Sequence, residues 1–315
     1  MESKNNWKAW LYLAPVIILL AVFTFYPIIN SFYVSFLKDY NYLTGAHKGF
    51  TFDNYLLVLT PFKKSGPGSM FEEVMQTALP NTLLLTVITV PISIVLSLLI
   101  ALGLNSIKVL KKFFQTVFFM PYVTNAIAIG MVFSVVFASD YGVFNNIFGL
   151  HNVSWIIPSE IVTGDKVNYW RALFAICFYI VWHSLPYKIL IFLGGLQNID
   201  AQYYDAAKID SAPKWKVALK ITVPLLSPQI LYMMITSFIG AFKEYNSVIG
   251  LFGKTGGTFD KTTGPRSMRT MVFFIYDMVA QNKVHYASAA SIFLFIIIML
   301  FTLVQSKVSK RRVHY

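Results

Sequence analysis

Long apolar stretches alternate with shorter polar segments along the whole chain. A helix needs about 20 consecutive, mainly apolar residues to cross the hydrocarbon core of a bilayer. The stretches that reach this length predict six membrane-spanning helices, at residues 10–37, 78–104, 113–137, 169–196, 223–251 and 287–304. The first stretch runs well past the short apolar core of a signal peptide, so we interpret it as a retained helix. The predicted fold class is an all-α polytopic membrane protein, with residues 1–315 forming one transmembrane domain.

The polar segments on the predicted outer side hold two further short helices. Residues 38–76 contain several turn-forming glycines, and a short helix is expected at Asp53–Leu59. Residues 252–286 begin with a glycine-rich turn. They continue into Met268–Val279, whose apolar positions suit a helix lying at the membrane surface.

Residues 197–222 are the most distinctive polar segment, because they carry many charges between two nearly uncharged spans. Tyr203–Ile209 is rich in helix-forming residues, and Trp215–Ile221 continues with apolar residues at helical spacing. Between them, Ser211-Ala212-Pro213 supplies a stop and a restart. Proline restricts the residue before it and suits the first turn of the following helix. The segment therefore predicts two short helices joined by a corner.

The composition supports a membrane protein and argues against nucleic-acid binding. Of the 315 residues, 56% are hydrophobic and only 13% are charged, whereas soluble domains carry about 25% charged residues. The net charge of +12 is not gathered with aromatic residues on a soluble domain, as a nucleic-acid surface would require. The single cysteine, Cys177, lies inside an apolar stretch and offers no disulfide framework.

The orientation is predicted from lysine and arginine, which concentrate in short cytoplasmic loops. The basic residues assigned to the inner side are Lys4, Lys8, Lys108, Lys111, Lys112, Lys208, Lys214, Lys216, Lys220, Lys307, Lys310, Arg311 and Arg312. The last outer loop opposes this assignment, with Lys254, Lys261, Arg266, Arg269 and Lys283. Because the inner segments are shorter and denser in positive charge, both termini are predicted in the cytoplasm.

No arrangement of residues typical of an enzyme is found. Gly253-Lys254-Thr255 has the end of a phosphate-binding loop, but Val248 stands where that motif requires its first glycine. The five histidines are scattered without metal-ligand spacing, and the common hydrolase and zinc motifs are absent from the sequence. We therefore expect no catalytic residue, cofactor site or metal site in this chain. Any ATP hydrolysis, with its Mg²⁺, is expected on a partner protein.

Polar side chains inside the spans are the candidates for a transport path, since each is costly in hydrocarbon. The polar candidates are Tyr122, Asn125, His183, Ser184, Tyr187, Ser237 and Glu244, and the small residues Gly240 and Ala241 lie beside Ser237 on the same predicted helix. Hydroxyl-bonding groups beside aromatic rings suit a sugar. The alternative is that small residues allow close helix packing and polar groups bond across helices. For Ser237 and Gly240 packing is at least as good an explanation, and Lys243 is placed to neutralise Glu244.

The charged segment resembles the EAA signature of binding-protein-dependent ABC importer permeases. The resemblance rests on Asp205-Ala206-Ala207, on Ser211 at the glycine position of the signature, and on Ile221-Thr222-Val223-Pro224. Serine is the larger departure, because glycine eases the corner and a Cβ penalises a positive φ. The phrases YPIINSFYVSF, at 26–36, and YASAASIFLFIII, at 286–298, extend the resemblance to the carbohydrate subfamily and its maltose-type first permease subunit.

The resemblance implies a sugar importer of the bacterial cytoplasmic membrane, with an oligosaccharide as the expected cargo. Its implied partners are a second permease, two ATPase subunits and an extracellular sugar-binding protein. The charged segment would face the cytoplasm and dock into the ATPase. The residues implied in this coupling are Tyr204, Asp205, Ala206, Ala207, Lys208, Ile209, Asp210 and Ser211.

Other readings of the sequence stay open. The charged segment could be an ordinary cytoplasmic loop. An ATP-independent channel or secondary transporter would need acids inside the spans, and Glu244 is the one serious candidate. A permease for another solute, such as glycerol phosphate, would want arginines on the path, and the spans offer only Arg171 at an outer end. The sequence does not identify the sugar.

Overall fold

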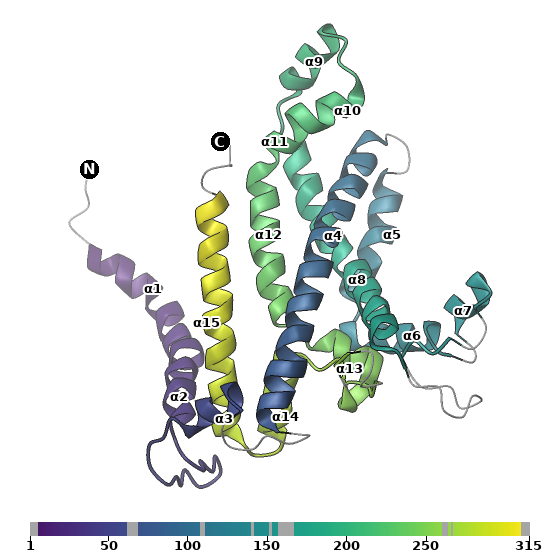
Figure 1. Ribbon diagram of the computed structural model, residues 1–315. Coiled ribbons are helices and arrows are strands. Elements are labelled where there is room, and N and C mark those ends of the chain that lie inside the picture. The colour runs from purple at the N-terminus through teal and green to yellow at the C-terminus, as the bar shows by residue number, and fades with distance from the viewer. Residues whose placement is uncertain are drawn as a thin grey trace. The chain divides into compact units, whose positions relative to one another are not determined.

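The computed structural model describes residues 6–61, 69–107, 111–139, 142–150, 153–156, 167–259, 264–265 and 267–309. Within these ranges the regular elements are helices, and the one β-type pairing is an isolated bridge between Leu37 and Phe50. Figure 1 shows the long apolar helices and the connecting segments. The predicted all-α class is therefore confirmed. Several basic residues used for the orientation, including Lys108 and Lys310–Arg312, lie outside the described ranges.

The helices form two compact units. Unit 1 consists of Met1–Val74 and Phe274–Ile296, and unit 2 of Met75–Phe273 and Ile297–Tyr315. Two helices cross a boundary between the units: α14 (Met271–Ala280) and α15 (Val284–Ser309). Unit 1 therefore combines segments from both ends of the chain.

The first apolar stretch of unit 1 is a continuous run of helix. It comprises α1 (Asn6–Leu20), the π-helical turn η1 (Ala21–Phe25) and α2 (Tyr26–Ser35). Its most apolar window, within Trp10–Ser35, has a mean hydropathy of 2.2 and no buried residue. A helix that is apolar on all sides is suited to a membrane span or to a buried position against another protein.

The end of α2 is tied down by the short helix α3 (Asp53–Leu59), whose bounds match the expected ones. The Asn54 amide donates to the carbonyl oxygens of Ser35 and Leu37, each over 2.9 Å. In the same unit, His285 at the start of α15 is buried and contacts the backbone of Tyr40. These contacts hold the polar segment after α2 against both α3 and the first turn of α15.

Unit 2 is built around two long helices, α4 (Leu79–Ser106) and α8 (Tyr169–Gln197), which pack along each other. The turn η2 (Glu72–Ala78) leads into α4, and α12 (Ser227–Phe242) packs against both. The inner apolar cluster between these helices contains Val90, Ile94, Ile189, Phe192, Leu226 and Met233. Thr82, Thr86 and Thr89 on α4 donate to carbonyls one turn earlier. Their buried hydroxyls are therefore satisfied within the helix.

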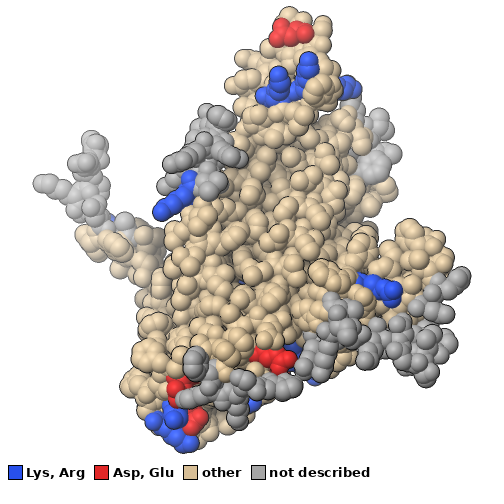
Figure 2. Space-filling view, in the orientation of Figure 1, with Lys and Arg blue, Asp and Glu red and all other residues tan. Residues whose placement is uncertain are grey.

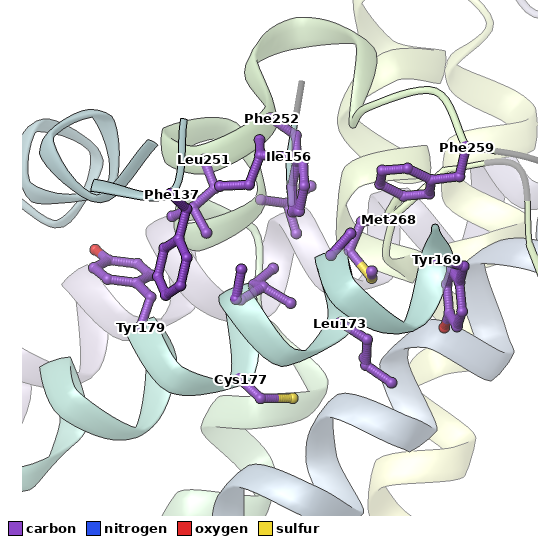
Figure 3. Close-up of a cluster of buried hydrophobic side chains, with 14 of the residues drawn as sticks. Phe137, Ile156, Tyr169, Leu173, Cys177, Tyr179, Leu251, Phe252, Phe259 and Met268 are labelled. Atoms are coloured by element: carbon purple, nitrogen blue, oxygen red, sulfur yellow. The ribbon is translucent and has the colours of Figure 1, made fainter. Parts of the chain in front are cut away.

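A second apolar cluster surrounds the first half of α8 (Figure 3). Phe137 and Tyr179 belong to this cluster. Leu251 and Phe252 join it from α13 (Asn246–Phe252). Here α6 (Ala126–Val136) and α13 meet at two glycines, where a Cβ on Gly130 would lie 2.7 Å from the Cα of Gly250. Only glycine permits so close an approach of the two backbones.

The third and fifth apolar stretches are helical, but each is broken. The third is α5 (Lys111–Val123) followed by α6, and these helices bend by 103° at the break. The break has a local cause, because the Asn125 side chain caps α6 by accepting from the backbone N–H groups of Ile127 and Ala128. In the fifth, Lys214–Leu225 and Ser227–Phe242 bend by 67°, and α13 is a separate helix after Phe242.

The remaining helices are short. They are α7 (Val143–Phe148), α9 (Ala201–Ile209), α10 (Lys214–Val217), the π-helical η3 (Ala218–Thr222), α11 (Val223–Leu225) and the 3-10 turn η4 (Gly253–Thr255). In all, the described residues contain four helices long and apolar enough to cross a membrane, or up to six if each bent pair is one span. The helix expected at Met268–Val279 is α14.

Candidate functional site

Two regions of unit 2 bring the candidate residues together. The first, here called the helical corner, is residues 198–222, with α9, α10 and η3. The second, here called the polar cavity, lies among α4, α5, α8 and α12. The helical corner contains the candidates implied in coupling, and the polar cavity contains most of the candidates for a transport path.

The turn of the helical corner follows from its sequence. The Asp200 side chain caps α9 by accepting from the Gln202 backbone N–H over 3.0 Å. At the other end, the N–H of Ala212 donates to the carbonyl of Ala207, and the N–H of Ser211 donates to that of Lys208. This is the Schellman pattern, which places one residue in the left-handed region and usually uses glycine there. Ser211 holds that position with φ of +51°. A serine holds this φ only at a steric cost that the glycine of the signature avoids.

One face of α9 packs inward and the rest lies open. Ala207 is 5% exposed and is the buried residue of α9. It borders a cavity of about 430 Å³ together with Leu102 and Leu196. The Tyr204 hydroxyl lies 3.3 Å from the Thr222 hydroxyl, which links α9 to η3. Ala207 and Tyr204 therefore maintain the shape of the helical corner.

The open side of the helical corner carries both charges and large apolar side chains. Ile209 is 85% exposed, and Trp215 and Leu219 are each 62% exposed. Asp205 and Lys208 form an exposed ion pair of 2.7 Å. Figure 2 shows acidic and basic side chains gathered at the helical corner and few along the helices that lead to it. The other coupling candidates, Ala206, Asp210 and Ser211, are also exposed.

The polar cavity has a volume of about 310 Å³, within the usual range for small-molecule sites. Its walls are Thr89, Val90, Ser93, Tyr122, Ile180, His183, Ser184, Tyr187, Lys188, Thr236, Ser237, Gly240, Ala241 and Glu244. All the path candidates are among them except Asn125, whose side chain is used in capping α6. Polar groups selected from three different apolar stretches thus meet at one place.

Aromatic side chains form one wall of the polar cavity. The rings of Tyr122 and Tyr187 stack with their centroids 5.7 Å apart and their planes at 16°. The Tyr187 hydroxyl lies 3.2 Å from that of Tyr232. Flat rings with hydroxyl groups at their edges provide a surface for the apolar face of a small ligand and partners for its polar groups.

Lys188 is the residue of the polar cavity that the sequence analysis missed. Its side chain is buried, with 6% exposure, and its ammonium group donates to the hydroxyls of Ser93 and Ser184. A lysine near the middle of an apolar helix is costly and therefore a strong sign of function. This signal was present in the sequence, where Lys188 follows Ser184 by one helical turn.

Glu244 is the acidic group of the polar cavity. It lies beyond the end of α12, so it does not continue one helical face with Ser237, Gly240 and Ala241. The carboxylate accepts from the Ser247 backbone N–H over 3.0 Å, and its own backbone carbonyl accepts from the Thr270 hydroxyl over 2.6 Å. Across the described residues no ion pair joins it to Lys243.

The described His, Cys, Asp and Glu side chains are not arranged as a metal centre. In the ranges that the structure describes, no three His, Cys, Asp or Glu side chains gather closely enough to hold an ion. The arrangement is a polar pocket between apolar helices, which can bind and orient a hydroxyl-rich molecule by hydrogen bonds and ring contacts.

The similarity of this chain to known proteins agrees with that chemistry. It is 31% identical over 297 residues to the lactose transport system permease protein LacF of Rhizobium radiobacter, covering 93% of this chain and 90% of LacF. It is 29% identical to the arabinooligosaccharides transport system permease protein AraP of Bacillus subtilis, covering 95% and 88% of the two chains.

The fold has a counterpart among solved structures. A chain of a bacterial ABC transporter involved in the import of the acidic polysaccharide alginate superposes with a TM-score of 0.75 at 20% identity, over 98% of this chain and 96% of that one. Residues 93–315 match the family described as binding-protein-dependent transport system inner membrane component. This chain belongs to that family of transporter permeases.

Proposed function

We propose that this chain is the permease subunit of an ATP-driven, binding-protein-dependent importer of a sugar, with an oligosaccharide as cargo. The observation that carries the proposal is the polar cavity, which joins stacked tyrosines to hydroxyl, amine and carboxylate groups among spanning helices. Those groups suit the two sides of a sugar ring. The lactose and arabinooligosaccharide permeases named above support a carbohydrate cargo.

The proposed path residues are those that border the polar cavity. Tyr122 and Tyr187 would stack on the sugar, while His183, Ser184 and Glu244 would bond its hydroxyl groups. Ser237, Gly240 and Ala241 would leave room for the ring. Asn125 is omitted because its side chain caps α6.

The helical corner is the proposed contact with the ATPase. Its exposed Ile209, Trp215 and Leu219 are apolar side chains that a protein partner would cover. ATP and Mg²⁺ would bind to that partner, and the exposed members of Tyr204–Ser211 would transmit its motion. The loop would therefore face the cytoplasm, together with both termini.

The proposed assembly contains a second permease, two ATPase subunits and an extracellular sugar-binding protein in the bacterial cytoplasmic membrane. If each bent pair is one span, the chain would have six spans, and this even number would place both termini on the same side of the membrane. ATP binding would draw the ATPases together, and the spans would then open the polar cavity to the outside. Sugar would be received there and released inward after hydrolysis.

Uptake of labelled lactose and arabinooligosaccharides tests the proposal. Cells with the complete transporter should take up at least one of these sugars, and removal of this chain should abolish the uptake. Loss of the ATPase activity should have the same effect. Ion-driven uptake by this chain alone in liposomes would instead favour an ATP-independent transporter.

A further inference from the structure

Lys188 has hydrogen-bond partners but no counter-charge. An ammonium group has three N–H donors, and Lys188 donates to two hydroxyls, those of Ser93 and Ser184. Among the described residues no carboxylate lies in ion-pair contact with it. A buried cation that has only neutral partners is costly, and an anion placed beside it would lower that cost. The Lys188 ammonium group can therefore bind an anion, and no described residue supplies one.

The place for such an anion is the polar cavity, because Lys188 borders it. The other charged group that borders it is Glu244, which lies beyond the end of α12. Lys188 follows His183 by five residues, which is about 7.5 Å along a helix axis. The polar cavity thus has an acidic group, Glu244, after α12 and a basic group, Lys188, on α8. The buried Nε2 atom of His183, which also borders the cavity, has no hydrogen-bond partner among the described residues.

We infer that the polar cavity binds sugars with an anionic substituent more tightly than neutral ones, and that Lys188 is the specificity-determining residue that binds this substituent. The inference rests on the proposed sugar transport and deepens it. The anionic group, a uronate carboxylate or a phosphate ester, lies at Lys188. Hydroxyl groups at the other end donate to Glu244, and this fixes the direction in which the substrate lies. The lack of arginines on the path argued against an anionic cargo. Lys188 supplies the positive charge instead, since lysine binds such groups as a point charge.

Equilibrium binding to the purified transporter complex, without the sugar-binding protein, tests the inference on this chain itself. The probes are digalacturonate and its methyl ester, which differ in charge but hardly in shape, with glycerol phosphate as the phosphate arm. We expect the wild type to bind digalacturonate about ten- to a hundredfold more tightly than the ester, as expected for a hydrogen bond to a charged group. Tight binding of glycerol phosphate alone would assign the anion to phosphate rather than carboxylate.

Substitutions at Lys188 separate recognition from packing. Lys188→Gln should remove the preference for the acid and leave the affinity for the ester unchanged, and Lys188→Arg should restore the preference. The matched control is Lys243→Gln, which removes an exposed lysine that does not border the polar cavity. A lysine that merely joined α4 to α8 would instead weaken acid and ester equally when replaced.

Failure of the inference can be told apart from failure of the proposed function. Equal binding of acid and ester by the wild type, together with no tight binding of glycerol phosphate, overturns the inference, and it does so even if Lys188→Gln fails to fold. If lactose or arabinooligosaccharides are still taken up, the sugar importer stands. If no sugar, neutral or acidic, is bound or taken up, both are wrong.

Discussion

The helical corner and the polar cavity are incomplete in opposite ways. The helical corner exposes apolar side chains such as Ile209 and Trp215, although it lies outside the apolar spans. The polar cavity places Lys188, His183 and Glu244 among those spans. Exposed apolar surface indicates a protein partner, while polar groups within a membrane domain indicate a ligand or an ion path. One helix, α8, leads from the polar cavity to the helical corner, so the same helix connects the expected ligand site with the expected protein contact.

The largest effect should come from the open face of the helical corner. Ala206→Arg places a long charged side chain on the exposed surface of α9 without entering its packed face. We expect loss of ATPase co-purification and loss of sugar uptake, of about a hundredfold or more, since a single misplaced charge can remove several kcal/mol from an interface. Sugar binding in the polar cavity should remain. Ala201→Arg, on another exposed side of α9, is the control.

A companion substitution distinguishes the docking surface from the support beneath it. Ala207→Arg forces a charge into the packed side of α9, beside Leu102 and Leu196. It should also abolish uptake, but through loss of the corner's own structure. Limited proteolysis should therefore cut the Ala207→Arg protein within residues 198–222 and leave the Ala206→Arg protein intact there. If both proteins resist cleavage and both lose the ATPase, Ala207 contacts the partner directly.

A substitution in the polar cavity should weaken sugar binding and leave the contact with the ATPase unchanged. Glu244→Gln keeps the shape of the side chain but removes the charge that accepts from sugar hydroxyls. We expect sugar affinity to fall about tenfold, the usual cost of weakening hydrogen bonds to a charged group. ATPase co-purification should be normal. A Glu244→Gln protein that binds sugar normally but loses its ATPase would reverse the assignment of the two regions.

The smallest effect is expected at the turn of the helical corner. Ser211 holds φ of +51°, and replacing it by glycine removes the steric cost of the left-handed conformation. Glycine also gains freedom in the unfolded chain, so the net stabilisation of the turn should be about 1 kcal/mol or less. Slower hydrogen exchange at the Ala212 amide would report it. Ser211→Ala keeps the Cβ and should give no gain.

The sequence was most informative where local rules decide the structure. Asp53 begins a short helix that ends at Leu59, as expected, and Pro213 restarts the chain after a corner. At Ser211 the resemblance marked a departure from the glycine of the signature, and this residue holds a φ of +51°. Local chemistry and short-range hydrogen bonds determine such features, so they can be read from a few neighbouring residues.

Features that depend on neighbours far along the chain were missed. The close approach of Gly130 to Gly250 can be recognised only when α6 and α13 are brought together. The bend at Asn125 was hidden because the apolar pattern continues across the cap. Lys188 was overlooked although its charge was plain, since its partner Ser93 lies on another helix. The candidates for the transport path were selected by residue type, and the cavity that most of them border forms only where three separate stretches meet.

Because unit 1 is built from two segments far apart in the sequence, it cannot form until late in synthesis. About 200 residues separate Val74 from Phe274, where its second segment begins. At roughly 5–20 residues per second, the ribosome needs about 10–40 s to synthesise the intervening chain. During that interval His285 has not yet been translated, so its contact with the backbone of Tyr40 cannot form. The helix within Trp10–Ser35, with no buried residue in its apolar window, is suited to that delay because lipid alone can hold it in place.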